Sequence, residues 1–519
     1  MALNSPIFLL FLLVCTVIYY LLPQKLRNVF LLAASYTFYL LALREHVVYA
    51  YAGLLIFTTA LSFFAAKLIY ASKSDTVRKV VMWTSVIIPV ALLFVFKYFN
   101  FFMSGLGSAA GAFGIGMDIP SVKWILPIGI SFYTFQIIGY ILDVYNKNTI
   151  PETSFVNYAL FVSFFPQIMS GPIGRSREML PQYREKHDFD YSHIVEGLQR
   201  FLLGAFKKCV IADGLARIVN GVYGDLATYK GLAIWAAVFM FGIQIYCDFS
   251  GYSDMAVGAG KILGFRLREN FNAPYMATNM SGFWKRWHMS LTTWFNDYIF
   301  TPLVWSRWAN KLVFGKKWEE HAPHFMTNIL IVFVISGLWH GASVTYIIWG
   351  LLNGMVRVIE ELISKRNKKL KRKKKKDAAA VIWLKRAGVF ALFSFTLIFF
   401  RSPSVSDAFY VIRNLFSWMP VKELTAQFAA LSDKGMIDGA IYYIFFWGSI
   451  AAAILFVAMW DKQLSDSMAQ KGDSLLMNPL AQYSAKKRWA LYWYVGLVTT
   501  AFYMISASVS TASFIYAGY

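Results

Sequence analysis

Long apolar runs without a charged side chain are the feature that most constrains how this 519-residue chain can fold. A charge-free run of about 17 to 25 residues is long enough to cross the hydrocarbon core of a bilayer as a helix. The clearest runs lie at residues 6–22, 47–66, 80–96, 124–142, 231–247, 440–460 and 489–519. Shorter runs at residues 28–43, 325–339, 341–356 and 387–400 bring the count to eleven. The sequence therefore predicts an all-α polytopic integral membrane protein with about eleven transmembrane helices.

The charge balance favours a membrane protein over a nucleic-acid-binding one. Only 15% of the residues are charged, whereas soluble domains carry about 25%. The 50 Lys and Arg residues exceed the 28 Asp and Glu residues, which gives a formal net charge of +22. Because spans exclude charge and cytoplasmic loops collect Lys and Arg, this excess is expected to reflect how the chain is seated in its membrane. We expect no nucleic-acid partner.

Basic residues in alternate loops orient the predicted spans. The loops after the first and third runs contain Lys25, Arg27, Lys67, Lys73, Arg78 and Lys79. The loop between them pairs Arg44 with Glu45 and is neutral. Since Lys and Arg accumulate on the cytoplasmic side, the N-terminus is predicted to lie outside. Residues 1–5 carry no positively charged side chain, so the first run is expected to stay as a span and not to be cleaved as a signal peptide.

A dense basic tract lies between the eighth and ninth runs. Ten of the twelve residues at 365–376 are Lys or Arg. Residues 364–377 are therefore predicted to form a basic cytoplasmic loop that touches anionic membrane lipids. We expect one transmembrane domain over residues 1–519, with core motifs at 124–356 and additional C-terminal spans at 378–519.

Two segments do not fit a simple span. Residues 155–173 are free of charge but contain Pro166 and a Ser-Gly-Pro sequence at 170–172. Proline removes a backbone hydrogen bond that lipid cannot replace, so this segment is either a kinked span or a re-entrant piece that helps to build an internal chamber.

The second segment, residues 281–300, predicts an amphipathic helix at the membrane interface. Its apolar side chains recur at steps of three and four residues, at Trp284, Trp287, Leu291, Trp294 and Tyr298. Lys285, Arg286 and Asp297 occupy other faces. His288 projects from near the apolar stripe.

Among seven histidines, His340 is the strongest functional candidate. It lies between two apolar runs, and an ionisable group at such a position is a functional hypothesis by default. Gly337 and Gly341 flank it and would let a ligand or another helix approach closely. The alternative is a histidine that only bonds a neighbouring helix. Surface roles are expected for His46, His187, His193, His321 and His324.

The remaining motifs narrow the chemistry. Cys15, Cys209 and Cys247 form no CxxC pair and are expected to be small buried hydrophobic residues, so no metal site is predicted. The chain has no HExxH, Walker or GxSxG motif. Without these, an intramembrane histidine is most naturally a general base toward a hydroxyl, and acyl transfer is a natural reaction for it.

Five phrases in order carry a family resemblance. They are FFPQIMSGPI at 164–173, QIYCDFSGYSD at 244–254, ENFNAPY at 269–275, FWKRWHMSL at 283–291 and GLWHG at 337–341. The sequence resembles the membrane-bound O-acyltransferase (MBOAT) superfamily, within the bacterial branch that contains the alginate O-acetylation membrane protein. The resemblance covers about residues 6–355. Residues 513–516 look like the family's aromatic terminal phrase, but residues 517–519 depart from it.

The resemblance implies a fold and a reaction. It implies about eleven spans, with re-entrant and amphipathic helices, around a central catalytic chamber where a cytoplasmic donor meets an extracytoplasmic acceptor. His340 matches the principal catalytic histidine, and His288 matches the upstream partner position. We expect His340 to be the general base and His288 to orient the thioester or the acceptor, while a covalent acetyl relay is the alternative. Trp287 and Trp339 are expected to be chamber walls.

The same resemblance implies the partners. The donor would be acetyl-CoA, used as a substrate and not as a bound cofactor, and a separate SGNH-type or related extracytoplasmic acetyltransferase would modify a polysaccharide. The place would be the bacterial inner membrane. Two alternatives stay open: D-alanyl transfer to teichoic acids from a carrier-protein thioester, and a glycan or lipid transporter or flippase.

Overall fold

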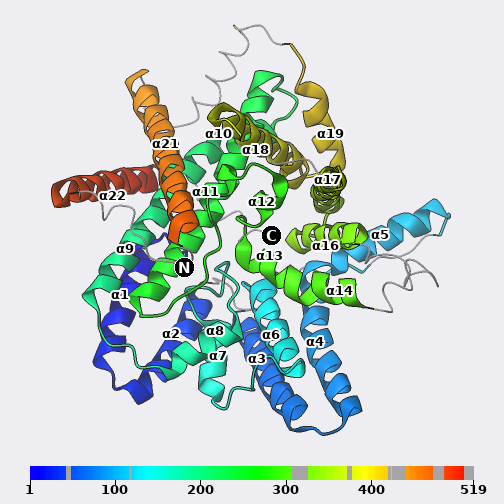
Figure 1. Cartoon of the computed structure of the whole chain (residues 1–519), viewed down its shortest axis with the longest axis vertical. Coiled ribbons are helices and arrows are strands. Elements are labelled where there is room, and N and C mark those ends of the chain that lie inside the picture. The colour runs from blue at the N-terminus through cyan, green and yellow to red at the C-terminus, as the bar shows by residue number, and fades with distance from the viewer. Residues whose placement is uncertain are drawn as a thin grey trace. The chain divides into compact units, whose positions relative to one another are not determined.

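The computed structural model describes residues 1–42, 48–115, 120–122, 124–306, 325–370, 377–418, 422, 440–471 and 484–507. Every regular element in these ranges is helical, and they contain no strand (Figure 1). The all-α prediction is confirmed for this part of the chain.

Each predicted apolar run overlaps a helix, although the number of membrane crossings stays a prediction. Four described helices are long and apolar enough to span a bilayer: α3 (Val48–Ala71), α4 (Asp75–Lys97), α11 (Leu232–Ile262) and α18 (Ala379–Arg401). Shorter apolar helices are α1 (Pro6–Leu21) and α16 (Phe325–His340). The other runs overlap α2 (Gln24–Ala42), α6 (Ile130–Tyr145), α17 (Val344–Lys369), α21 (Ala440–Lys471) and α22 (Ala485–Ala507).

The chain divides into two compact units, and the expectation of one domain over residues 1–519 stays a prediction. One unit comprises Met1–Phe201 and Tyr252–Glu269, and the other comprises Leu202–Gly251 and Asn270–Tyr519. The first unit also contains α5 (Phe99–Ala112), α7 (Phe155–Ser163), α8 (Ser176–Arg184) and most of α9 (Tyr191–Phe206). The second also contains α10 (Asp213–Gly224), α12 (Met280–Trp284), α13 (Met289–Phe295), α14 (Thr301–Trp305) and α19 (Val405–Asn414).

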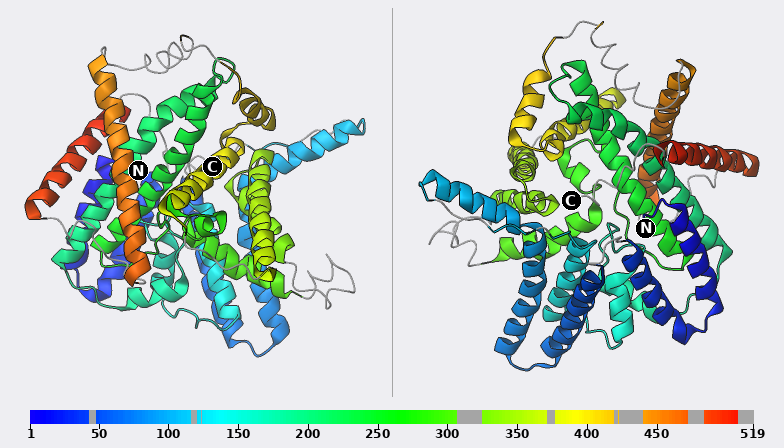
Figure 2. Two further views of the ribbon diagram at one scale, coloured as in Figure 1. Left: turned by 45° about the horizontal axis from the view of Figure 1, so that its top comes forward. Right: turned by 180° about the vertical axis from the view of Figure 1, so that it is seen from behind.

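In the first unit, α3 and α4 pack side by side as a helical hairpin (Figure 2). The turn between them is short because Ser74 starts α4 as its N-cap. Its side chain accepts a hydrogen bond from the Val77 N–H at 3.5 Å. Asp75 then places a negative charge in the first turn, where the helix dipole favours it.

The span predicted at residues 124–142 starts later than expected, and this correction has a local cause. Helix α6 begins at Ile130, after Pro127 and Gly129. Gly129 adopts a left-handed conformation with φ of 70°. A Cβ atom there would lie 2.1 Å from the carbonyl oxygen of Ile168, so only glycine fits this turn.

The segment at 155–173 is broken and is not a continuous kinked helix. Helix α7 ends at Ser163, and residues 164–175 are irregular and mostly buried. Protein groups satisfy the freed backbone donors: the Phe165 N–H donates to Ser35 Oγ at 3.2 Å, and the Ser170 N–H donates to the Tyr252 hydroxyl at 3.3 Å. Irregular backbone at membrane depth needs such protein partners. That the segment lines a chamber stays a prediction.

In the second unit, α16 and α17 pack closely through glycines (Figure 1). A Cβ atom at Gly337 would lie 2.2 Å from the carbonyl oxygen of Tyr346. A Cβ atom at Gly350 would lie 2.2 Å from the carbonyl oxygen of Phe333. The glycine at 337 therefore admits a neighbouring helix, one of the two possibilities expected from the sequence, and this crossing holds the last turn of α16 in place.

The substitution Gly350→Ala is expected to destabilise the protein by about 1–3 kcal/mol, because the added methyl group would overpack the helix crossing. The matched control is Gly388→Ala in α18, where a Cβ atom would meet nothing within 4 Å. That control should be neutral or stabilising by up to about 1 kcal/mol, since alanine is the better helix former. Thermal unfolding of both variants in detergent measures the difference. Equal melting temperatures would contradict the close-packing argument.

Helix α17 extends into the basic tract, and the assignment of residues 364–377 as a loop between two spans stays a prediction. Helix α17 continues to Lys369, and residues 371–376 lie outside the described residues. Lys and Arg are good helix formers, and Arg366, Lys368 and Lys369 stand in the last turn, where the helix dipole favours cations. The cytoplasmic location of the tract stays a prediction.

Candidate active site

The segment at 281–300 is not the single helix that its spacing predicts. Helix α12 ends at Trp284, and α13 begins only at Met289. His288 stands between them in a left-handed conformation with φ of 43°, which ordinary side chains rarely adopt. The prediction of one continuous amphipathic helix is therefore wrong at Lys285 to His288.

A distant backbone segment causes this break. The Met289 N–H donates to the carbonyl oxygen of Asn270 at 2.8 Å, and the Asn272 N–H donates to the carbonyl oxygen of Arg286 at 3.0 Å. These bonds replace hydrogen bonds that a continuous helix would make within itself. Helical spacing alone contains no sign of this partner, which is why sequence periodicity misplaced the break.

The amphipathic character of the segment survives the break. Trp287, Leu291 and Trp294 are buried, whereas Lys285 and Asp297 are exposed. Trp287 packs among aromatic rings, with centroids 5.1 Å from Phe271, 5.4 Å from Phe283 and 5.0 Å from Phe393. This aromatic packing anchors the turn that carries His288.

His288 is buried and polar on one side only. Its side chain is 2% exposed, and its Nδ1 lies 2.9 Å from Asn270 Oδ1. The ring of Phe249 packs edge-on against the imidazole at 4.6 Å. Burial lowers the pKa of His288 to about 3, because the imidazolium would lose its hydration. The residue is therefore neutral at physiological pH.

His340 is the last residue of α16 and is 5% exposed. The helix ends there because Gly341 follows, and the next helix starts at the N-cap Ser343, whose Oγ accepts from the Thr345 N–H at 3.3 Å. Aromatic rings surround the imidazole, with centroids 5.1 Å away at Trp349 and 5.2 Å away at Phe400. The sequence placed His340 between two apolar runs, and the structure shows that it is buried among aromatic rings.

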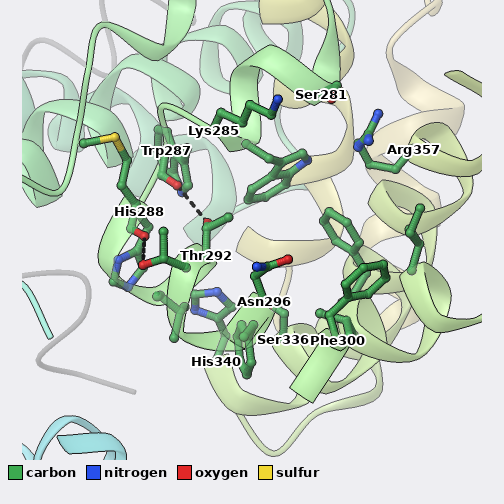
Figure 3. Close-up of a pocket in the computed structure, with 18 residues that line it drawn as sticks. Ser281, Lys285, Trp287, His288, Thr292, Asn296, Phe300, Ser336, His340 and Arg357 are labelled. Atoms are coloured by element: carbon green, nitrogen blue, oxygen red, sulfur yellow. Dashed lines mark hydrogen bonds between the residues drawn. The ribbon is translucent and has the colours of Figure 1, made fainter. Parts of the chain in front are cut away.

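Both histidines line one cavity of about 480 Å³ (Figure 3). Most of its wall is apolar. Its polar and charged lining comes from Ser281, Lys285, Thr292, Asn296, Ser336 and Arg357. In Figure 3, Lys285 and Arg357 lie along one side of the cavity, and the two imidazoles lie toward the other. The cavity therefore brings together two imidazoles and two cations.

Trp287 and Trp339, the two predicted chamber walls, differ in their relation to the cavity. Trp287 lines the cavity. Trp339 lies against both imidazoles instead, with centroids 6.0 Å from His288 and 4.7 Å from His340. The two histidines thus share one aromatic neighbour as well as one cavity.

Arg357 is a cavity residue that sequence reasoning missed. It stands one position after the apolar run at 341–356, and a cation at the end of a span was the available signal. Its Nη1 lies 2.6 Å from Glu360 Oε2. Glu360 also accepts from the backbone N–H groups of Met280 and Ser281, at 2.6 and 2.8 Å. This carboxylate therefore ties α17 to the start of α12.

A buried charge cluster lies beside the turn of α11 that packs on His288. Lys208 Nζ lies 2.6 Å from Asp248 Oδ1 and 2.9 Å from Asp213 Oδ1. Lys208 belongs to a π-helical turn, Lys207–Ala212, and Asp248 directly precedes Phe249. Sequence reasoning missed this cluster, because the three residues lie in different helices or turns.

The remaining histidines and the three cysteines that the sequence analysis discussed do not line the cavity, as far as the structure describes them. The His187 ring Nε2 lies 2.8 Å from the carbonyl oxygen of Gln182, and His193 lies 4.0 Å from Asp190. Cys15, Cys209 and Cys247 are buried and are not joined in disulfides, as expected. His46, His321, His324 and residues 513–519 lie outside the described residues. Among those that the structure describes, no group of three or more His, Cys, Asp and Glu side chains is placed to hold a metal ion.

The geometry suits acid–base chemistry on a hydroxyl group. A neutral imidazole can accept a proton from a hydroxyl group, and the apolar part of the cavity wall keeps water away from an activated acyl group. The two cations can attract an anionic substrate.

Comparison with known proteins identifies relatives that are acyltransferases by name. The family model "MBOAT, membrane-bound O-acyltransferase family" matches residues 146–401. A "Probable alginate O-acetylase AlgI" of Azotobacter vinelandii is 36% identical over 367 residues, which cover 70% of this chain and 69% of that protein. The protein of the same name from Pseudomonas aeruginosa is 37% identical, with 70% and 66% covered.

Two further relatives are named for other activities. A peptidoglycan O-acetyltransferase of Helicobacter pylori is 32% identical over 391 residues, which cover 70% of each chain. A teichoic acid D-alanyltransferase of Bacillus subtilis is 32% identical over 250 residues, which cover 47% of this chain and 61% of that protein. The chain thus spans roughly two thirds of the length of these relatives.

Proposed function

Because the chain belongs to the membrane-bound O-acyltransferase family, a family of acyltransferases, we propose that it moves an acetyl group from cytoplasmic acetyl-CoA across the membrane for O-acetylation of an extracytoplasmic polysaccharide. The observation that carries this proposal is the pair of buried imidazoles, His288 and His340, in the wall of one largely apolar cavity. The acceptor is an alginate-like exopolysaccharide or a cell-wall glycan. These are the polymers in the names of the relatives that cover most of this chain.

The proposed reaction is a balanced transfer between a thioester and a hydroxyl. The acceptor oxygen bonds to the acetyl carbon while one imidazole removes the hydroxyl proton. The bond between the acetyl carbon and sulfur breaks, and the sulfur takes the proton to leave as a thiol. The other imidazole orients the thioester or the acceptor. An SGNH-type or related extracytoplasmic acetyltransferase completes delivery to the polymer, and the site of action is the bacterial inner membrane.

D-Alanyl transfer is the second candidate, because teichoic acid D-alanyltransferases are among the relatives. The O-acetyltransferases cover a larger part of the chain, 70% against 47% for the Bacillus subtilis protein. The two cations of the cavity, Lys285 and Arg357, also suit a donor with several phosphate groups. Both observations support acetyl-CoA over a carrier-protein thioester.

A donor-competition assay tests the proposal. Inverted membrane vesicles that contain the protein would receive acetyl-CoA labelled on the acetyl group, or a D-alanyl carrier-protein thioester labelled on the alanyl group. We expect label from acetyl-CoA to reach a hydroxyl acceptor, and vesicles with the double variant His288→Ala/His340→Ala to show background transfer only. Transfer from the carrier thioester alone would replace the proposal with D-alanyl transfer.

A further inference from the structure

The cavity runs along one face of α16. The cavity-lining residues of this helix share that face, and they are Ile329, Val332, Phe333, Ser336 and His340. Ile329 precedes His340 by 11 residues. At about 1.5 Å of rise per residue, these two positions are about 16 Å apart along the helix. The cavity is therefore elongated, with His340 near one end.

Arg357 lines the cavity at the end that is remote from His340 (Figure 3). Helices α16 and α17 pack against each other and run antiparallel, because only a short connection joins them. A Cβ atom at Gly354 would lie 3.4 Å from Leu330 Cα, so these two residues stand at the same level of the helix pair. Arg357 follows Gly354 by three residues, which is nearly one more turn away from His340.

Glu360 holds the guanidinium of Arg357 at this end. The side chain of Arg357 is 15% exposed, and its Nη1 lies 2.6 Å from Glu360 Oε2. The same carboxylate accepts from the backbone N–H groups of Met280 and Ser281 and is therefore fixed by two helices. A guanidinium has five N–H donors, so the contact with Glu360 leaves donors for a ligand in the cavity.

This end of the cavity carries a net positive charge. Glu360 balances one of the two cations, Arg357 and Lys285. None of the described residues that line the cavity is Asp or Glu. A guanidinium binds phosphate oxygens with two parallel hydrogen bonds, and an ammonium group adds a mobile point charge. The pair therefore suits a phosphate or diphosphate group.

The length of the cavity matches a phosphorylated pantetheine thioester. Roughly thirteen bonds separate the sulfur from the phosphorus of such an arm, and at about 1.1–1.2 Å of extension per bond they span about 15 Å. This length is close to the separation of Ile329 and His340 along α16. Between the two ends, polar groups for the amides of the arm come from Thr292, Asn296 and Ser336. A phosphate at Arg357 thus places the thioester beside the imidazoles.

We infer that Arg357, held in place by Glu360, binds the phosphate of a pantetheine thioester donor, with Lys285 as the second cation. The donor then lies along α16 with its thioester at the histidines. This inference rests on the proposed function and deepens it by assigning residues that bind the donor. The diphosphate of CoA matches two cations better than the single phosphodiester of a carrier-bound arm, so CoA is the expected source.

The direction of α17 agrees with a cytoplasmic donor. The basic tract that is predicted to be cytoplasmic begins at Lys365, eight residues after Arg357. That is about 12 Å along the helix. The cationic end of the cavity is therefore nearer to the tract than His340 is. A donor that enters from this side meets Arg357 before its thioester reaches the imidazoles.

Three donors test the inference: acetyl-CoA, acetyl-4′-phosphopantetheine and acetylpantetheine, which lacks phosphate. Initial rates of transfer in inverted vesicles give KM and kcat for each. Arg357→Gln is expected to raise KM for the two phosphorylated donors by about 10- to 100-fold, because it removes charge-assisted hydrogen bonds. KM for acetylpantetheine, and kcat for all three donors, should stay within about threefold of wild type, because binding lost equally from ground and transition states leaves kcat unchanged.

Three further variants make the result specific. Arg357→Lys keeps the charge without the planar fork and should raise KM less than Arg357→Gln does. Lys285→Gln should act in the same direction, and it tests the inference if Arg357→Gln does not fold. Arg386→Gln is the matched control, because Arg386 donates to the carbonyl oxygen of Met276 and does not line the cavity. It should keep wild-type KM values. If neither Arg357→Gln nor Lys285→Gln changes the KM ratio between phosphorylated and phosphate-free donors, the inference is overturned.

A second measurement needs no acetyl transfer. A ligand that binds the folded protein raises its melting temperature. In detergent, we expect CoA to raise the melting temperature of wild type and Arg386→Gln but not of Arg357→Gln, and pantetheine at the same concentration to have no effect. Equal shifts with CoA in wild type and Arg357→Gln would overturn the inference.

The same measurement separates the inference from the proposed function. A holo carrier protein, which bears the arm as a phosphodiester, is the third probe. If the shift that depends on Arg357 comes from the holo carrier and not from CoA, the phosphate site stands and the proposed acetyl-CoA donor fails. Binding of CoA that depends on Arg357, without any acetyl transfer, would likewise support the phosphate site and count against the proposed function alone.

Discussion

Alanine at His288 or at His340 is expected to reduce acetyl transfer by about 10²- to 10⁴-fold, the usual contribution of a positioned acid–base group. Both imidazoles lie in the wall of one cavity, so each substitution removes a group from the proposed reacting centre and leaves the apolar wall in place. The measurement is the initial rate of transfer from labelled acetyl-CoA in membranes that hold equal amounts of each variant.

Two comparisons make this result specific. His187→Ala and His193→Ala change histidines that do not line the cavity, and both should keep the wild-type rate. The double variant His288→Ala/His340→Ala should be little worse than the slower single variant, because residues that act as a unit show non-additive losses. Undiminished transfer by either single variant would remove that histidine from the mechanism.

The two histidines show what sequence can and cannot predict about this site. Their residue types, their apolar surroundings and the phrases around them were enough to select both from seven candidates. Their closeness in space could not be predicted, because it depends on how Trp339 of α16 packs against the turn that carries His288. Asn270 stands inside one of the recognised phrases, yet only the folded chain shows that its oxygen faces His288.

The two irregular segments differ in how well they could be predicted. Pro166 and the Ser-Gly-Pro sequence at 170–172 are local signals that predicted either a kinked span or a re-entrant piece, and the structure has a break after Ser163. The break before Met289 has no such signal. It is imposed by hydrogen bonds to Asn270 and Asn272, which are distant in sequence, and a period of 3.6 residues continues through the break.

The buried cluster of Lys208 leads to the largest expected effect on stability. Lys208 and Asp248 are 1% and 2% exposed at their side chains, and Asp213 adds a second buried carboxylate. Lys208→Met removes the ammonium group that both carboxylates face. Breaking a buried pair by removing one partner costs about 3–5 kcal/mol. We expect a correspondingly lower melting temperature in detergent and less folded protein in membranes.

An exposed ion pair with the same geometry provides the control. Lys385 Nζ lies 2.6 Å from Asp377 Oδ2, the distance seen between Lys208 and Asp248, but these side chains are 45% and 39% exposed. Lys385→Met should therefore cost only about 0–1 kcal/mol. The variant Lys208→Met/Asp213→Asn/Asp248→Asn should regain part of the loss, because the cost comes from uncompensated buried charge. Equal stability of Lys208→Met and Lys385→Met would mean that burial does not decide the strength of these pairs.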